Sequence, residues 1–466
     1  MKRIESSAAA LADITGLTLF CRDKPLIRVF KNLLERVLEK PSVGADELRY
    51  RLSIVEAWTS LLRTMIQSEY GDSFYTAVAF LTLTDDNVFT HRAEAQEWDS
   101  LSPLLAALAK NDIACLERIA QFDITSLGFY IAEQFHQAGL DYLAATIEAE
   151  ARSLLAAKSL QNISEEVWNF LSILHENHDW VAALPEFAAY LRIHGAGELG
   201  RYHSFRWAGT NFLKPVRNPD TVRVADFTGY EDQRQVVNAN TLRFLEGKPA
   251  NNLLLYGDRG TGKSATVKAV CNEYARQGLR LLEVAKRDLL ELPTILNILA
   301  SRSLRFIIFI DDLSFESVDD SFTTLKMLLE GGIETKSSNV VVYATSNRRH
   351  LVKERLTDRP STAAAADAMI TGDMRAFDSM QEQFSLADRF GLTVVFTTPN
   401  QDEFLRIAEY IAVQRGILKA SGTSEETLKR FRENALRWER WFNGRSPRTA
   451  VQFVDWFTGG DGFPWE

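Results

Sequence analysis

A complete phosphate-loop motif near the middle of the chain constrains the fold more than any other feature. Residues 257–264 match G-x-x-x-x-G-K-[ST] without departure. The apolar run Asn252–Tyr256 precedes the motif, and Ala265–Arg276 follows it with helical spacing. Glycines at a strand-to-helix turn let backbone N–H groups converge on a phosphate, and the helix N-terminus favours an anion. A glycine-rich surface turn is the alternative, but the flanking strand and helix favour a nucleoside triphosphate site.

Each position of this loop is a predicted cofactor-binding residue. These positions are Gly257, Asp258, Arg259, Gly260, Thr261, Gly262, Lys263 and Ser264. Lys263 is expected to reach the outer phosphates, and the Ser264 hydroxyl to take one position on Mg²⁺.

A second motif follows about 50 residues later, as a phosphate loop requires. The apolar run Arg305–Ile310 is typical of a strand buried on both faces of a parallel sheet, and it ends in Asp311-Asp312. Because ligands bind at the carboxyl ends of such strands, we expect Asp311 to hold Mg²⁺ through water and Asp312 to activate water. A plain acidic pair on a loop is the alternative.

A third predicted strand, Asn339–Ala344, is followed by Thr345-Ser346-Asn347. An asparagine is common where strands end. As the third strand end in this order, however, Asn347 is a candidate to orient the attacking water through its amide.

Together these three strand ends resemble the pattern of AAA+ ATPases, in which the position of Asn347 is called sensor 1. Residues 386–391 resemble the segment that carries the arginine finger, at Arg389, and their sequence is most similar to that of bacterial replication initiators. Residues 444–450 resemble the sensor 2 segment, with Arg448 as the sensor. The resemblance covers about residues 226–457. The whole chain also resembles an uncharacterised bacterial group of AAA+ ATPases with a long helical N-terminal region.

The resemblance implies ATP and Mg²⁺ as cofactors and assembly into a homo-oligomer when ATP binds. It makes Gly229 and Tyr230 candidate contacts of the adenine base. It also implies that Arg448 senses the γ-phosphate in cis and that Arg389 does so in trans, at a neighbouring subunit's site.

Two departures from the family pattern bear on activity. Asp312 stands where the family usually has a catalytic glutamate; Asp312 suffices, or nearby Glu316 substitutes, or hydrolysis is slow. Residues 285–290, after the predicted strand Leu279–Val284, hold no aromatic residue and no glycine. The sequence therefore does not support a pore loop that threads polypeptides.

The expected fold class is α/β, with a parallel-sheet AAA+ core and a helical lid preceded by an all-α domain. Residues 1–200 have helical periodicity, residues 201–225 are expected to form a linker, 226–400 the core and 401–466 the lid. The basic residues of the linker favour a solvated connector, with a strip that contacts nucleic acid or a subunit as the alternative. The expected lid core contains Trp438, Trp441, Phe453 and Trp456.

Composition excludes several classes. The formal charge of −9 over 466 residues argues against a surface that is basic overall. Three separated cysteines suit a reducing compartment and predict no metal site. The absence of a signal peptide and of a run of about 20 apolar residues predicts a cytoplasmic protein with no membrane insertion.

The predicted function is ATP hydrolysis that drives or gates conformational change of a protein or nucleic-acid client. A slow nucleotide-gated switch or scaffold, DNA-associated as replication initiators are, is the alternative. A small-molecule kinase is a weaker option, because two sensor arginines argue against it.

Overall fold

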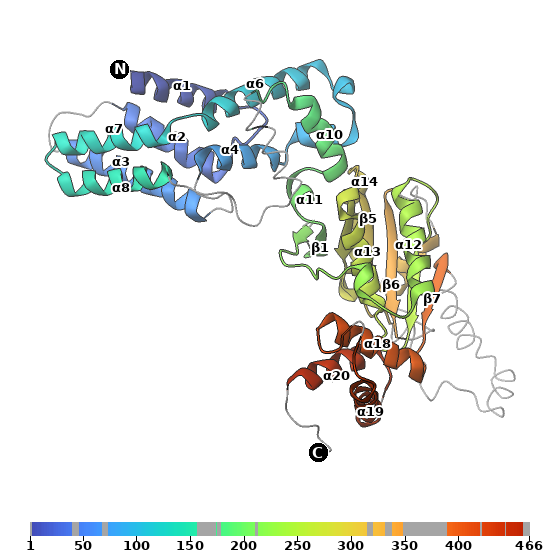
Figure 1. The fold of residues 1–466 in the computed structure, drawn as a ribbon. Coiled ribbons are helices and arrows are strands. Elements are labelled where there is room, and N and C mark those ends of the chain that lie inside the picture. Colours follow the sequence, from blue (N-terminus) through green and yellow to red (C-terminus); the bar gives the residue numbers. More distant parts are fainter. Residues whose placement is uncertain are drawn as a thin grey trace. The chain divides into compact units, whose positions relative to one another are not determined.

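The computed structural model describes residues 2–39, 46–67, 73–155, 174, 179–209, 213–314, 320–330, 338–347, 389–419, 422–442 and 444–459. The chain divides into two compact units, Met1–Arg201 and Tyr202–Glu466 (Figure 1). Glu316, the alternative candidate base, lies outside the described residues, as do Trp168, the basic stretch 348–355 and the irregular stretch 357–383 of the sequence.

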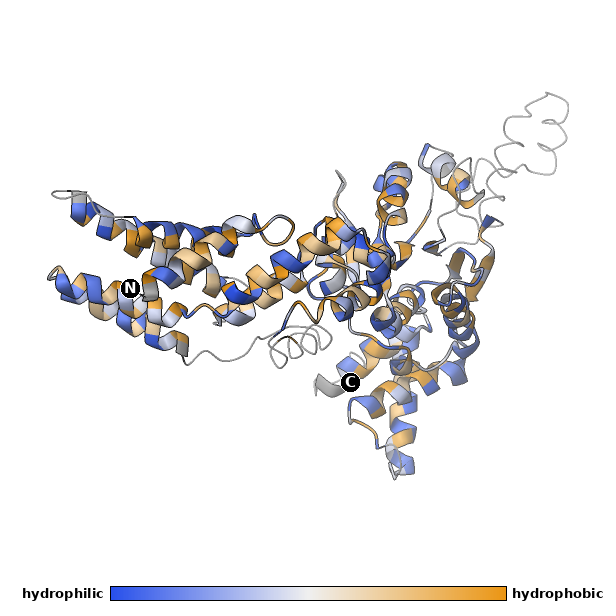
Figure 2. Cartoon of the chain, turned by 90° about the horizontal axis from the view of Figure 1, so that it is seen from above, coloured by the Kyte–Doolittle hydropathy of each residue, from blue (hydrophilic) through white to orange (hydrophobic). Residues whose placement is uncertain are grey.

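The first unit is all helical in its described part. Its elements are α1 (Lys2–Gly16), α2 (Pro25–Leu38), α3 (Asp46–Gln67), α4 (Phe74–Leu83), α5 (Val88–Ala95), η1 (Trp98–Ser100), α6 (Pro103–Ala120), α7 (Ile124–Gln137), α8 (Asp141–Leu155), α10 (Leu184–His194) and α11 (Gly197–Arg201). Hydrophobic and hydrophilic residues alternate along these helices (Figure 2). The hydrophobic faces bury one continuous core that includes Trp58 and Phe74, as the helical periodicity predicts.

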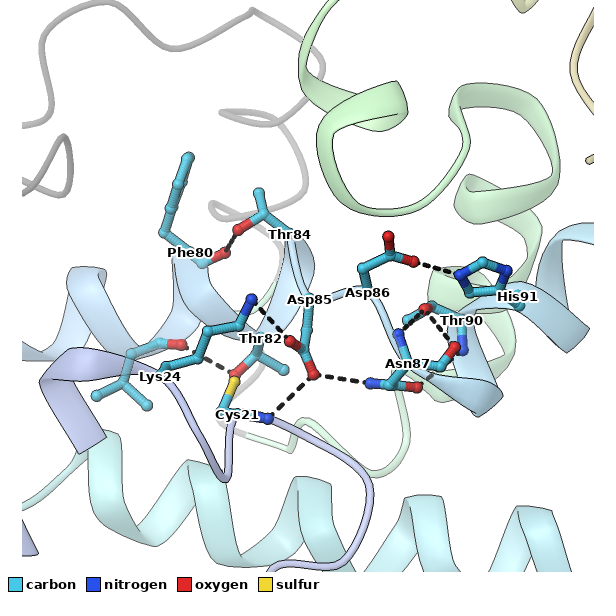
Figure 3. Close-up of polar contacts among 11 residues, drawn as sticks. Cys21, Lys24, Phe80, Thr82, Thr84, Asp85, Asp86, Asn87, Thr90 and His91 are labelled. Atoms are coloured by element: carbon cyan, nitrogen blue, oxygen red, sulfur yellow. Dashed lines mark hydrogen bonds and ion pairs between the residues drawn. The ribbon is translucent and has the colours of Figure 1, made fainter. Parts of the chain in front are cut away.

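Two buried carboxylates hold the loop between α1 and α2. Asp112 of α6 accepts hydrogen bonds from the backbone N–H groups of Thr18, Leu19 and Phe20 and from the Thr18 hydroxyl. Asp85 accepts from the Cys21 N–H and the Asn87 amide, and pairs with Lys24 at 3.0 Å (Figure 3). Buried carboxylates are tolerated only when they are bonded in this way.

The second unit contains a sheet with the strand order β2-β1-β4-β5-β6-β3-β7. The strands are β1 (Ser204–Trp207), β2 (Leu213–Pro215), β3 (Leu253–Gly257), β4 (Leu279–Glu283), β5 (Arg305–Ile310), β6 (Val340–Ser346) and β7 (Leu392–Phe396). All pairings are parallel except that of β1 with β2. The accompanying helices are η2 (Val224–Asp226), α12 (Glu231–Leu245), α13 (Lys263–Tyr274), η3 (Ala275–Gln277), η4 (Lys286–Glu291), α14 (Leu292–Ala300) and α15 (Asp320–Glu330).

Strands β1 and β2 differ from the linker expected at residues 201–225. β1 pairs with β4 and extends the sheet, and β2 forms its edge. Phe205 and Trp207 point into the interior while Arg206 between them is exposed, which is the alternation of a half-buried strand. Four residues were too few for this alternation to be recognised among the surrounding basic residues and prolines.

Three helices form the lid: α18 (Gln401–Gln414), α19 (Glu425–Trp441) and α20 (Pro447–Gly459). Asn400 and Glu403 form a capping box that fixes where α18 begins. Trp438 and Phe453 are buried in the lid core, as predicted. Trp441 and Trp456 are not, because 57% and 38% of their surfaces are exposed; their predicted core position was wrong.

The α/β fold class predicted from the sequence is confirmed: a mostly parallel sheet with a helical lid, preceded by a helical N-terminal region. No described helix is long and apolar enough to span a bilayer.

Candidate nucleotide site

Strand register brings the predicted site residues to one edge of the sheet. Ile310 of β5 lies opposite Ala344 of β6, and Tyr256 of β3 lies opposite Ser346. The residues that follow these pairs are the acidic pair, Asn347 and the phosphate loop. Because all three strands are parallel, their carboxyl ends meet at the same edge.

Asp311 is the centre of a hydroxyl network. Its Oδ1 accepts hydrogen bonds from Ser264 Oγ and Thr345 Oγ1, both at 2.6 Å. The Thr345 hydroxyl also accepts from the backbone N–H of Asp312 at 2.9 Å. Thr345 was not predicted as a site residue. It lies opposite Asp311, because Ile310 pairs with Ala344, and aligning the two predicted strands in parallel could have indicated this.

Lys263 lies at the start of α13 with its ammonium turned into the loop. Its Nζ donates to the carbonyls of Gly257 and Asp258, at 2.9 and 2.7 Å, and to Asn347 Oδ1 at 3.2 Å. Burial lowers the pKa of Lys263, and the neighbouring aspartates oppose that shift.

Asp312 and Asn347 are in direct contact. Asn347 Nδ2 donates to Asp312 Oδ1 at 2.6 Å, so the Asn347 amide bridges Lys263 and Asp312. Asp312 has a φ of 51°, a left-handed conformation that few residues other than glycine adopt. Backbone outliers of this kind persist where the surrounding structure enforces them, and they concentrate at functional sites.

These groups line a cavity of about 860 Å³. Its phosphate-loop wall runs from Arg259 to Ala265, with Lys268 one turn later, and the acidic wall holds Asp311, Asp312, Thr345 and Asn347. The remaining lining residues are Asp220, Asp226, Phe227, Thr228, Ile407, Tyr410, Ile411, Pro447, Arg448 and Val451.

The two candidate adenine contacts lie beside this cavity rather than among the residues that line it. The adjacent Phe227 and Thr228 line it instead. Tyr230 has a φ of 56°, donates its hydroxyl to the Thr397 carbonyl at 2.7 Å and packs on Phe396 with ring centroids 5.3 Å apart. Burial raises the pKa of Tyr230 to about 12.

The lid contacts the phosphate loop directly. The backbone N–H of Arg448 donates to the Gly260 carbonyl at 3.2 Å, and Arg448 lines the cavity. A Cβ on Gly260 would lie 2.9 Å from Ser446 Oγ. The predicted sensor 2 residue thus lies beside the predicted phosphate site.

Arg389 lies near the amino end of β7, whereas the cavity lies at the carboxyl ends of the strands. It precedes β7, whose last residue, Phe396, pairs with Gly257 at the start of the phosphate loop. A five-residue strand spans about 13 Å between its first and last residues. Arg389 is therefore separated from its own chain's cavity by the length of β7.

The observed groups fit a triphosphate with Mg²⁺. A Cβ on Gly262 would meet nothing within 4 Å, and this residue has a φ of 94°. The open backbone there is suited to phosphate oxygens. Within the described residues, no cluster of three or more His, Cys, Asp or Glu side chains forms a metal site.

Comparison with known proteins places the chain in a family. A family model described as "Protein of unknown function (DUF815)" matches residues 200–461. The chain belongs to this family. No curated protein matches the sequence.

Solved structures similar to this DUF815 protein include the RuvB Holliday junction branch migration motor of Thermotoga maritima. This match has 13% identity and a TM-score of 0.28, and it covers 50% of this chain and 71% of that one. A point mutant of the same motor has 13% identity and a TM-score of 0.29, with coverages of 51% and 73%.

Proposed function

We propose that this protein is an ATPase that binds ATP with Mg²⁺ and hydrolyses it to drive or gate a conformational change of a client complex. The observation that carries the proposal is the convergence of the Ser264 and Thr345 hydroxyls on one oxygen of Asp311, beside the phosphate loop. A hydroxyl from the loop and a carboxylate at the end of another strand are the pair that holds Mg²⁺ in phosphate-loop enzymes.

The binding roles follow from position. Ser264 and Asp311 would hold Mg²⁺, which neutralises charge on the phosphates when bound. Lys263 would exchange its carbonyl partners for phosphate oxygens. The apolar part of the cavity, with Phe227, Ile407 and Ile411, is suited to the base.

For hydrolysis, Asp312 would accept a proton from the attacking water and Asn347 would fix the direction of that carboxylate. Glu316 remains the alternative base. Arg448 would contact the terminal phosphate from the lid of the same chain.

We further propose that Arg389 completes the site of a neighbouring copy. Its position beyond the far end of β7 supports this, because it is remote from the cavity of its own chain. An arginine suits the task because its charge is permanent and its planar group can bind two phosphate oxygens.

The test is nucleotide binding by Lys263→Ala. Titration of a fluorescent ATP analogue should show an affinity at least about tenfold weaker than that of the unaltered protein, because a charged phosphate contact is worth about 1.5–3 kcal/mol. Lys248→Ala is the matched control, since Lys248 pairs with Glu246 on the surface at 2.6 Å. Equal affinities of the two variants would refute the assignment.

A slow nucleotide-gated switch is the second candidate. Asp312 is one methylene shorter than glutamate, and its Oδ1 is bonded to the Asn347 amide. Fast turnover that a client stimulates favours the motor, and slow turnover that no client changes favours the switch. Capture of clients by Asp312→Asn protein with ATP, scored for both protein and nucleic acid, would identify the client class.

A further inference from the structure

Asp258, the second residue of the phosphate loop, holds the segment that leads into the lid. Its Oδ2 accepts hydrogen bonds from both the backbone N–H and the hydroxyl of Thr398, at 2.8 and 2.6 Å. Its own N–H donates to the Phe396 carbonyl at 3.0 Å. A loop that needs only to cradle phosphate does not require this side chain.

The segment that Asp258 holds is the connection between the sheet and the lid. β7 ends at Phe396 and α18 begins at Gln401. Thr397 accepts a hydrogen bond from Tyr230, and Asn400 caps α18. We call residues 397–400 the hinge.

The same residue also contacts Lys263. The Asp258 carbonyl accepts a hydrogen bond from Lys263 Nζ at 2.7 Å and from Thr261 Oγ1 at 2.8 Å. The backbone carbonyl of Asp258 therefore contacts residues of the phosphate loop, whereas its side chain contacts the hinge. When Lys263 moves from this carbonyl to a phosphate oxygen, the Asp258 peptide loses a charged partner.

We propose that Asp258 is a positioning residue that couples occupancy of the phosphate loop to the lid, through its paired hydrogen bonds to Thr398. The proposal rests on the proposed ATP binding. A movement of the Asp258 backbone is transmitted to the hinge by the Asp258 side chain, which is short and accepts two hydrogen bonds from Thr398. The orientation of α18 relative to the sheet then depends on whether Lys263 contacts the Asp258 carbonyl or a phosphate oxygen.

The charge of Asp258 suits this role. The hydrogen bonds from the Thr398 hydroxyl and N–H lower the pKa of Asp258, so the carboxylate stays ionised at neutral pH. A group with a lowered pKa contributes its stabilisation above the ordinary aspartate pKa. That contribution is lost as the pH falls through the lowered value.

The test compares Thr398→Val with Thr393→Val in the full chain. Thr398→Val removes the hydroxyl and keeps the backbone N–H, whereas Thr393 is an exposed residue of β7 that faces solvent. Hydrogen exchange of the α18 and α20 amides is measured with and without ATP and Mg²⁺, alongside kcat and KM. Thr398→Val should lose most of the nucleotide-dependent change in exchange and lower kcat about tenfold, with KM changed by less than about threefold. Thr393→Val should match the unaltered protein.

Two further variants make the result specific. Thr398→Ser keeps the hydroxyl and should restore both the exchange response and kcat. Asp258→Ala removes the carboxylate but keeps the carbonyl that contacts Lys263. Combined with Thr398→Val it should be no worse than the more affected single variant, because both break the same interaction.

The outcomes separate the two proposals. If the protein binds ATP in a Lys263-dependent way but Thr398→Val behaves like Thr393→Val, the coupling is refuted and ATP binding stands. Additive effects in the double variant also refute the coupling. If the unaltered protein binds no ATP, both proposals fail.

Discussion

At the residue scale, Gly257 is the described glycine at which an added Cβ would make the shortest contact. It has a φ of 139°, and a Cβ added there would lie 2.0 Å from the Phe396 carbonyl oxygen. Real Cβ atoms do not approach backbone oxygen so closely, so β7 or the phosphate loop would have to move. The residue thus serves strand pairing in addition to its proposed role in the phosphate loop.

Gly257→Ala is therefore expected to destabilise the second unit by about 3 kcal/mol or more. For a unit of this size that lowers the melting temperature by about 6 °C or more. Gly444→Ala is the control, because a Cβ there meets nothing within 4 Å. Melting followed by circular dichroism compares the two, and equal melting temperatures would contradict the close approach.

Asp312→Asn tests the assignment of the base. The variant should bind ATP as the unaltered protein does and hydrolyse it about 10²-fold more slowly, because an amide does not accept the proton of water as a carboxylate does. Phosphate release and analogue binding are measured on the same samples. If Glu316→Gln slows hydrolysis and Asp312→Asn does not, Asp312 is not the base.

Much of the candidate site could be predicted at this scale, and the reason is local. The phosphate loop, the acidic pair and Asn347 each follow an apolar strand in the sequence, and parallel pairing then brings them together. Thr398 could not be predicted, because its partner Asp258 lies 140 residues away. Only the pairing of β3 with β7 makes them neighbours.

At the scale of elements, the long helices and the apolar strands β3, β4, β5 and β6 could be predicted from the sequence, whereas the strands β1 and β2 could not. α3, from Asp46 to Gln67, is one of the helices that the periodicity of residues 1–200 predicts. β1 joins the sheet by pairing with β4, a strand more than 60 residues away, and β2 pairs only with β1, so no local signal marks either strand. Trp441 was misplaced for a related reason: it lies at the end of α19, beyond the packed part of that face.

The loop between α1 and α2 provides a prediction at this scale. Asp112→Asn should destabilise the first unit by about 2–4 kcal/mol. Asp112 accepts with both oxygens, on Oδ2 from three N–H groups and on Oδ1 from the N–H and hydroxyl of Thr18, whereas an asparagine amide accepts on only one atom and carries no charge. Asp99→Asn on the exposed η1 is the control. Denaturation midpoints followed by tryptophan fluorescence should fall for the first variant and stay unchanged for the second.

At the scale of the whole molecule, the proposed role of Arg389 requires a second copy of the chain. Arg389→Ala should leave ATP affinity nearly unchanged and lower turnover by about 10³-fold. Mixing it with Lys263→Ala protein should restore part of the activity, because each chain supplies the group that the other lacks. Light scattering should detect larger particles with ATP than without.

A cis ion pair of Arg389 is the competing explanation. It predicts a turnover per subunit that does not depend on dilution and no recovery when the two variants are mixed. Arg389→Lys separates charge from shape, because lysine keeps the charge but loses the planar group.

β7 connects the proposed subunit contact at one of its ends with the phosphate loop at the other. Arg389 precedes this strand, and the Phe396 carbonyl and Thr398 at its other end are bonded to Asp258. An extended strand cannot shorten appreciably, so a displacement along its axis at one end appears at the other. If a neighbouring subunit's phosphate draws Arg389 outward, the same movement reaches the phosphate loop of Arg389's own chain. Neighbouring subunits would then hydrolyse ATP one after another, with no further element needed to set the order.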